Sequence, residues 1–330
     1  MKIRELLGRS AFMMSLALIV ALTLGLSNNF PYIEPQIRSN ITILILAIMM
    51  TVSLSRIPFK GLNPAQEPRS VARAMLLGIV VASAIPLIAS FFFEGTPYQI
   101  GLIFIALTPF AASVVPLSYI LRGDMSHAAR GTIVVYCASI IYIPVVVWLM
   151  LRQTIDIQDV IIAVVEVVLV PLILSRLLVK VKIDKNTMGI FLNFCIFFLV
   201  FLSVGASANL FRSDVVLLAT FMGIALLRTF GLGLGLEYIE KKKGIPWEQR
   251  VTDVLMTSYK NKGIAIALVT AVAVSLGTNV GAALFPVSAS IVIEICWVIF
   301  IDSVLYSPSR MKKELAREGR SKEVGKLSDS

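Results

Sequence analysis

Two lysines and an asparagine interrupt a long apolar segment, LMTSYKNKGIAIALV at residues 255–269. Charged side chains at membrane depth are costly, and they usually face a partner or a water-filled cavity. Lys260 and Lys262 could attract an anionic substrate, although Lys262 could equally reach toward the backbone carbonyls of a broken helix. The residue types and their spacing therefore indicate a transport site. Its candidate binding residues are Thr257, Ser258, Lys260, Asn261 and Lys262, and Gly263 marks the helix break.

A second interrupted segment reads IFIALTPFAASVVPLSYIL, residues 103–121. Pro109 and Pro116 flank Ser113, and proline removes a backbone donor and disfavours helix in the residue before it. A broken helix presents N–H groups to an anion, while its free carbonyls and hydroxyls such as Ser113 could coordinate a small cation. The alternative is that the prolines only kink one helix, and that the polar run at 257–263 is a loop between shorter helices.

Three more ionisable residues fall inside apolar segments: Arg228, Glu166 and Glu294. Glu294 is the candidate partner of Lys260, with a separate hydrogen-bonded acid as the alternative. Arg228 could pair with an anion, form a structural ion pair or extend toward the membrane surface. Glu166 has no obvious local partner, so we expect it to face protein rather than lipid. The only histidine, His127, is expected to be solvated at a helix end.

The composition identifies the class of protein. The 330 residues are 57% hydrophobic and only 15% charged, with a mean hydropathy of +0.87. An ordinary soluble domain has about 25% charged residues, and no soluble fold of this size could hide so much apolar surface. The sequence has no Walker A motif, no metal-ligand spacing and no Ser-His arrangement. These features predict an all-α membrane protein that is not an enzyme and uses no cofactor or metal.

Apolar segments of about 20 residues can cross a bilayer as helices. Ten such segments lie at roughly 11–30, 40–57, 72–93, 97–121, 130–151, 158–178, 187–210, 213–238, 250–276 and 280–305. Of the 30 basic residues, 24 fall on one side of this arrangement, three on the other side and three at membrane depth. This bias predicts a multi-pass protein of the cell membrane with both termini in the cytoplasm. It also accounts for the net charge of +10 without a nucleic-acid partner.

The two interrupted segments occupy matching places in the chain. Ten spans divide into five and five, and a unit with an odd number of spans must be followed by a copy of opposite orientation. Segments four and nine then correspond, which is typical of a transporter site near the membrane midplane. We therefore predict two inverted five-helix repeats with broken helices 4 and 9. They form one transmembrane domain at residues 1–307, followed by a polar cytoplasmic tail at 308–330.

The sequence resembles the bile acid:sodium symporter family, within the bile/arsenite/riboflavin transporter superfamily. The resemblance rests on the ten spans, on SYILRGD after the first break and on YKNKGIAIALV at the second break. Residues that fall on the family's short motifs are Tyr119, Arg122, Gly123, Lys260, Asn261, Gly263, Ile264 and Ala265. The resemblance implies a panel of helices 1, 2, 6 and 7 and a core of helices 3, 4, 5, 8, 9 and 10. It also implies organic-anion substrates, such as bile acids or small carboxylates.

This sequence departs from the family at the sodium ligands. By the resemblance, the positions of those ligands hold Val114, Val115, Ala128, Thr132, Met256 and Lys260. Only Thr132 keeps a suitable oxygen, whereas sodium needs several oxygen ligands. We therefore expect sodium binding to be lost and Lys260 to replace an ion. Whether Lys260 titrates decides between proton coupling and a uniporter or exchanger.

The sequence thus predicts a secondary active transporter of a small organic anion that works by alternating access. Its expected partners are that anion, membrane lipid and, if Lys260 titrates, a proton. One alternative is an arsenite-type effluxer, with which Glu294 is compatible, but the first break has no thiol. Another alternative is a membrane sensor or scaffold that transports nothing.

Overall fold

The computed structural model describes residues 10–55, 63–151, 157–181 and 184–317, together with Leu7 and Ile57. Within these residues the fold is all-helical, as predicted. The long and half-length helices are α2 (Ser10–Leu26), α3 (Pro35–Leu54), α4 (Pro68–Met75), α5 (Ala82–Phe91), α6 (Pro97–Leu107), α7 (Val114–Ile120), α8 (Met125–Met150), α9 (Ile157–Val164), α10 (Val170–Leu177), α11 (Lys185–Ser213), α12 (Val215–Leu226), α13 (Leu232–Lys242), α14 (Trp247–Ser258), α15 (Lys262–Ser275), α16 (Val280–Phe300) and α17 (Pro308–Arg317). Short 3₁₀ turns lie at η1 (Pro64–Gln66) and η4 (Leu178–Lys180).

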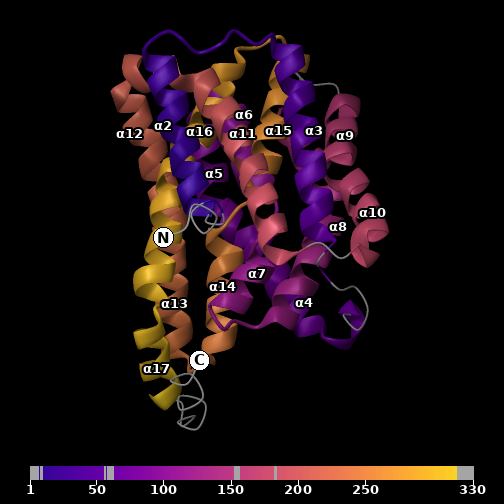
Figure 1. Ribbon diagram of the computed structural model, residues 1–330, viewed down its shortest axis with the longest axis vertical. Coiled ribbons are helices and arrows are strands. Elements are labelled where there is room, and N and C mark those ends of the chain that lie inside the picture. Colours follow the sequence, from indigo (N-terminus) through magenta and orange to yellow (C-terminus); the bar gives the residue numbers. More distant parts are fainter. Residues whose placement is uncertain are drawn as a thin grey trace.

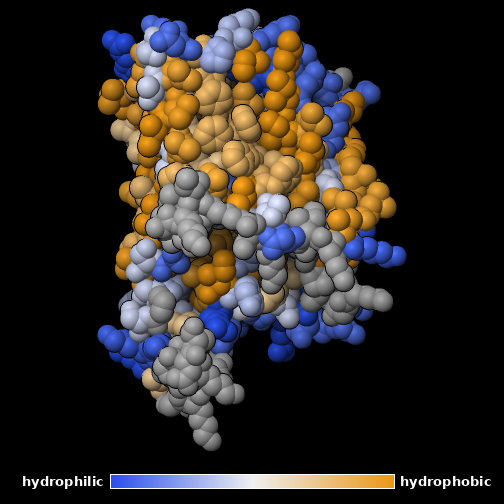
Figure 2. Space-filling view, viewed as in Figure 1, coloured by the Kyte–Doolittle hydropathy of each residue, from blue (hydrophilic) through white to orange (hydrophobic). Residues whose placement is uncertain are grey.

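Most of these helices are suited to a membrane. Seven continuous helical stretches in the described residues are long and apolar enough to cross it: Pro35–Leu54, Pro68–Phe91, Met125–Met150, Gln158–Lys180, Thr187–Ser213, Val215–Lys242 and Val280–Leu305. Three shorter apolar helices accompany them, Phe12–Leu26, Pro97–Leu107 and Lys262–Ser275. Apolar side chains cover the middle of the face in Figure 2, between hydrophilic ends. The chain is therefore a multi-pass membrane protein.

Four of the long stretches contain a π-helical turn, in which a backbone N–H bonds to the carbonyl five residues earlier and not to the one four residues earlier. These turns are η2 (Leu76–Val81), η3 (Val165–Leu169), η5 (Leu227–Gly231) and η6 (Ile301–Leu305). In η2 the N–H of Ala82 bonds to the carbonyl of Leu77, whereas an α-helix would use the carbonyl of Gly78. The π turn therefore releases the Gly78 carbonyl from that bond. Such turns often occur at functional sites.

The helix is interrupted at both segments that the sequence analysis singled out. Between α6 and α7 the chain passes through Pro109, and between α14 and α15 it passes through Lys260. The two interruptions pair as a short antiparallel bridge. Ala111 N donates to Tyr259 O at 2.8 Å, and Asn261 N donates to Pro109 O at 2.9 Å. In Figure 1, α6 and α15 occupy the upper half of the bundle, and α7 and α14 occupy the lower half.

The other predicted break residues lie just inside the half-helices. Pro116 is exposed in the first turn of α7, where a missing N–H leaves no helical bond unmade. Gly263 is the second residue of α15, and a Cβ atom there would lie 2.7 Å from Leu46 Cδ1. Glycine at this position therefore lets the start of α15 approach α3 closely.

Residues from 308 onward were expected to be a polar tail. The described part of that segment, 308–317, forms α17, which contacts α14. Met311, Glu314 and Leu315 of α17 are buried. The segment begins with a proline, which suits a helix start, and its apolar residues repeat at i and i+4. The remainder of the expected tail, 318–330, lies outside the described residues.

Candidate functional site

The Lys260 side chain ends in a cage of oxygens where the two interruptions cross. Only 2% of the residue is exposed. Its Nζ donates to four acceptors, which are the carbonyls of Gly78 (3.0 Å), Ala106 (2.8 Å) and Thr108 (2.8 Å) and the hydroxyl of Ser83 (3.2 Å). None of these acceptors is a carboxylate. A single positive charge surrounded by neutral oxygens resembles the surroundings of a bound metal cation.

The backbone breaks make these oxygens available. Gly78 belongs to the π turn η2, which frees its carbonyl from the bond that an α-helix would make. Ala106 and Thr108 lie at the end of α6, where the last carbonyls of a helix lack intrahelical donors. The same end carries the negative pole of the helix dipole, which favours a cation. The cage is therefore built by backbone geometry and not by acidic side chains.

Asn261 ties the two interruptions to α8. Its Oδ1 accepts the N–H of Ile264 at 3.1 Å, which caps α15, and its Nδ2 donates to the phenol of Tyr136 at 2.8 Å. The phenol in turn donates to the carbonyl of Phe110 at 3.1 Å. This chain of hydrogen bonds fixes the crossing against the long helix α8, because each member satisfies the next one in a buried place.

The Tyr136 link can be tested by removing one hydroxyl. We expect Tyr136→Phe to lower the free energy of unfolding by about 1–3 kcal/mol, because the Phe110 carbonyl and the Asn261 amide each lose a buried partner. The measurement is thermal unfolding of the purified protein in detergent. Tyr119→Phe is the control, since Tyr119 is 61% exposed. An equal change in both variants would show that the link does not hold the crossing together.

Glu294 of α16 does not pair with Lys260, which corrects the first prediction; it is the separate hydrogen-bonded acid of the alternative. Its carboxylate instead binds Arg228 of η5 and lies 3.2 Å from the Nζ of Lys262. All three residues are buried. Lys260 had no need of a carboxylate, because the neutral oxygens already satisfy its ammonium. Three roles were left open for Arg228, and the structure therefore supports the structural ion pair.

This cluster carries an excess of positive charge. One carboxylate faces two cations, and Lys262 begins α15, next to the positive pole of that helix. Arg228 Nε and Nη1 find no hydrogen-bond acceptor among the described residues, and the Glu294 oxygen near Lys262 Nζ is the one that Arg228 also binds. Arg228 also borders a small cavity of about 10 Å³ together with Ser290. The buried surroundings of the crossing are thus electropositive.

The predicted hydroxyl ligands do not converge on one point. Thr132, Thr257 and Ser258 are buried and bond to carbonyls of their own helices, at 2.8, 2.8 and 2.6 Å. Ser258 also accepts the indole N–H of Trp297 at 2.9 Å. Ser113 is half-buried at the residue before α7. These contacts give the first three residues a structural role in the conformation observed.

Two other expectations about charged residues were wrong. Glu166, expected to face protein, is exposed in the π turn η3. His127, expected in solvent, is 3% exposed. Its ring bonds to Ser70 Oγ at 2.7 Å and to Asp253 at 3.0 Å. Asp253 also accepts from Arg73 at 2.7 Å, so the histidine belongs to a network that joins α4, α8 and α14.

Comparison of the sequence with models of known protein families gives one match. A family model described as the Sodium Bile acid symporter family matches residues 42–225, more than half of the chain. The chain belongs to the sodium bile acid symporter family. Members of this family are transporters, so the match confirms the predicted family and the prediction that the protein is not an enzyme. No curated protein matches the chain.

In this family member, the matched range includes α6 and the Gly78 and Ser83 side of the cage, but it ends before Lys260. Positions that the resemblance assigns to sodium ligands are buried and largely apolar: Val114, Val115, Ala128 and Met256. A Cβ atom at Gly131 of α8 would lie 2.7 Å from Met256 Cε. The Met256 side chain therefore fills the space between α14 and α8.

Sequence reasoning missed Gly78, Ser83 and Tyr136. Backbone carbonyls carry no residue-type signal, so nothing in the sequence distinguishes Gly78 from any other glycine in a span. Ser83 gave a weak signal, a small polar residue three positions before Pro86 in an apolar helix. Tyr136 could have been noticed as a phenol inside the apolar stretch 133–150, since a buried tyrosine hydroxyl usually needs a partner.

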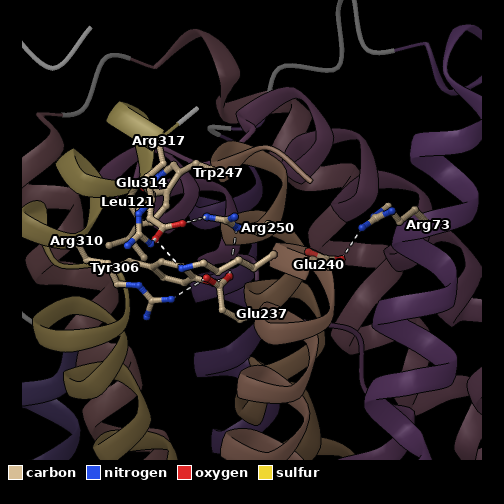
Figure 3. A network of polar contacts seen from close by, with 11 residues as sticks. Arg73, Leu121, Glu237, Glu240, Trp247, Arg250, Tyr306, Arg310, Glu314 and Arg317 are labelled. Carbon is tan, nitrogen blue, oxygen red and sulfur yellow. Dashed lines mark hydrogen bonds and ion pairs between the residues drawn. The ribbon is translucent and has the colours of Figure 1, made fainter. Parts of the chain in front are cut away.

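A second network lies where α13, α14 and α17 meet (Figure 3). Glu237 binds Arg310 at 2.9 Å and the phenol of Tyr306 at 3.3 Å. Glu314 of α17 binds Lys241 at 2.6 Å and Arg250 at 3.2 Å. Burial would raise the pKa of the Glu314 carboxyl, but these two cations outweigh it and hold that pKa below its usual value. The network fastens α17 to the lower half of the second broken helix.

Proposed function

We propose that the protein is a secondary transporter of a small organic anion, and that the Lys260 ammonium takes the place of a sodium ion. The observation that carries this proposal is the cage of four oxygens around Lys260 Nζ at the crossing of the two interruptions. A fixed ammonium supplies one positive charge there without any ion having to enter. The apolar side chains at the family's ligand positions support the same conclusion.

We further propose that the helices form ten spans in two inverted repeats, with α6–α7 and α14–α15 as the corresponding broken helices. The panel would consist of α2, α3, α9–α10 and α11, which is supported by the packing of α11 on α2 and α3 and of α10 on α3. The remaining helices up to residue 307 would form the core. Alternating access then moves one bundle against the other, and both termini lie in the cytoplasm of a cell-membrane protein.

The preference for an anion follows from charge. Lys262 and Arg228 together exceed the charge of Glu294, and Lys262 stands at the N-terminus of the 14-residue helix α15. We propose that Lys262, with Asn261 and Ser113 beside the crossing, lines the path of the substrate. In this proposal Thr132, Thr257 and Ser258 support the helices in the present conformation.

The test is uptake into proteoliposomes of a panel of labelled organic anions, with arsenite as a separate arm. We expect uptake of at least one carboxylate anion to be unchanged when sodium is replaced by choline, because no site remains for sodium to fill. A pH gradient across the vesicle shows whether a proton is coupled. Sodium-stimulated uptake would contradict the lysine-for-ion proposal. Uptake of arsenite alone would contradict the organic-anion proposal.

A further inference from the structure

A groove runs along the outside of the bundle between α13 and the segment formed by η6 and α17. Its volume is about 610 Å³. One part of its wall is apolar and includes Leu234 of α13 and Leu305 of η6. The other part is basic, with Lys241, Lys242 and Arg310. The groove therefore combines an apolar wall with a cluster of cationic side chains.

The groove lies where both helices leave the apolar part of the molecule. α13 changes over two turns from leucines and glycines to two lysines, and a third lysine follows it directly. The stretch through α16 and η6 ends at Tyr306, two residues before Pro308. Tyr238 also borders the groove and is 60% exposed. Exposed tyrosines and runs of lysine are typical of the level of lipid headgroups. The apolar wall thus faces acyl chains and the basic end faces headgroups.

The cations at the basic end keep part of their charge available. The side chains of Lys241 and Arg310 are 38% and 30% exposed although each binds a carboxylate. Lys242 lies over the Tyr238 ring, with its Nζ 5.0 Å from the ring centre. The carboxylate that borders the groove, Glu237, is buried and is already bound by Arg310 and Tyr306. Three cations therefore face two carboxylates, Glu237 and Glu314, and Lys242 supplies the excess positive charge that is open to a ligand.

We propose that this groove binds one molecule of an anionic phospholipid. Its phosphate lies among Lys241, Lys242 and Arg310, and an acyl chain lies against Leu234 and Leu305. A phospholipid with net negative charge complements both walls, whereas a free phosphate would use only the basic end. A zwitterionic phospholipid would match the apolar wall but would gain less from the cations. Through Arg310 and Lys241 the bound lipid also contacts the network that fastens α17.

The test is native mass spectrometry of the full chain in detergent with added phosphatidylglycerol or phosphatidylcholine. We expect the wild-type protein to retain one phosphatidylglycerol in preference to phosphatidylcholine. Lys242→Gln should weaken that retention about fivefold, the effect of one cation near an anionic headgroup. Lys243→Gln is the matched control, because it removes the same charge from the next residue, which is exposed and does not border the groove.

Unchanged retention in Lys243→Gln together with the loss in Lys242→Gln supports the site. Equal losses in the two variants would overturn it, because they would show attraction to general surface charge. Equal retention of the two lipids would also overturn it. Displacement of phosphatidylglycerol by soluble glycerol phosphate would assign the basic end to a free phosphate and remove the lipid from the proposal.

Discussion

Lys260→Met is expected to lower the free energy of unfolding by about 3 kcal/mol and to abolish transport. Methionine fills nearly the same volume but donates no hydrogen bond. The carbonyls of Gly78 and Thr108 then lose a charge-assisted bond in a buried place, each worth about 1.5–3 kcal/mol. The Ala106 carbonyl keeps the hydroxyl of Ser83. The measurement is thermal unfolding in detergent, with anion uptake into proteoliposomes as the second readout.

The control for this variant is Lys243→Met, which removes an exposed lysine at the end of α13. It should leave unfolding and uptake close to the wild type, since surface substitutions usually change stability by less than about 0.5 kcal/mol. If Lys260→Met unfolds at the wild-type temperature and still transports, the ammonium is neither holding the crossing nor acting as the fixed cation.

Glu294→Gln is expected to have an effect of similar or larger size. The substitution removes the carboxylate that faces two buried cations, Arg228 and Lys262. Breaking a buried pair by removing one partner costs about 3–5 kcal/mol, because an uncompensated charge stays behind. Here two cations stay behind. Thermal unfolding and the yield of folded protein after solubilisation measure the loss.

The matched control is a second glutamate that lies within an apolar segment, Glu166. Glu166→Gln changes the same functional group, but Glu166 is exposed on η3. It should change the unfolding temperature little. A second variant, Glu294→Gln with Lys262→Gln, should regain part of the stability, because it removes one of the two unpaired charges. If the double variant is no more stable than Glu294→Gln, charge imbalance does not explain the loss.

The sequence was sufficient for the broad architecture. Apolar length placed the helices within a few residues, and the proline at 109 and the polar run at 257–263 located both interruptions. These features are visible because proline and buried lysine are costly in a span unless the backbone changes there.

The partners of the charged residues could not be predicted in the same way. Glu294 was the candidate partner of Lys260, but the acceptors of the Lys260 ammonium are the Ser83 hydroxyl and backbone oxygens released by a π turn and a helix end. Neither feature is tied to a residue type. His127 and Asp253 lie 126 positions apart, and their contact depends on how α8 packs against α14. Glu166 was expected to face protein because it has no local partner in the sequence, but it is exposed on η3.

The most direct test of the central claim is a sodium titration of Lys260→Ala and of the wild type, followed by thermal unfolding. Alanine leaves the oxygens of Gly78, Ser83, Ala106 and Thr108 around an empty space, so sodium should stabilise the variant. A hundredfold excess over its dissociation constant corresponds to about 2.7 kcal/mol. Choline is the control, since it is too large for the cage. The account predicts that sodium raises the unfolding temperature of Lys260→Ala and leaves the wild type unchanged. A saturable rise in the wild type, or no response to sodium in the variant, would contradict it.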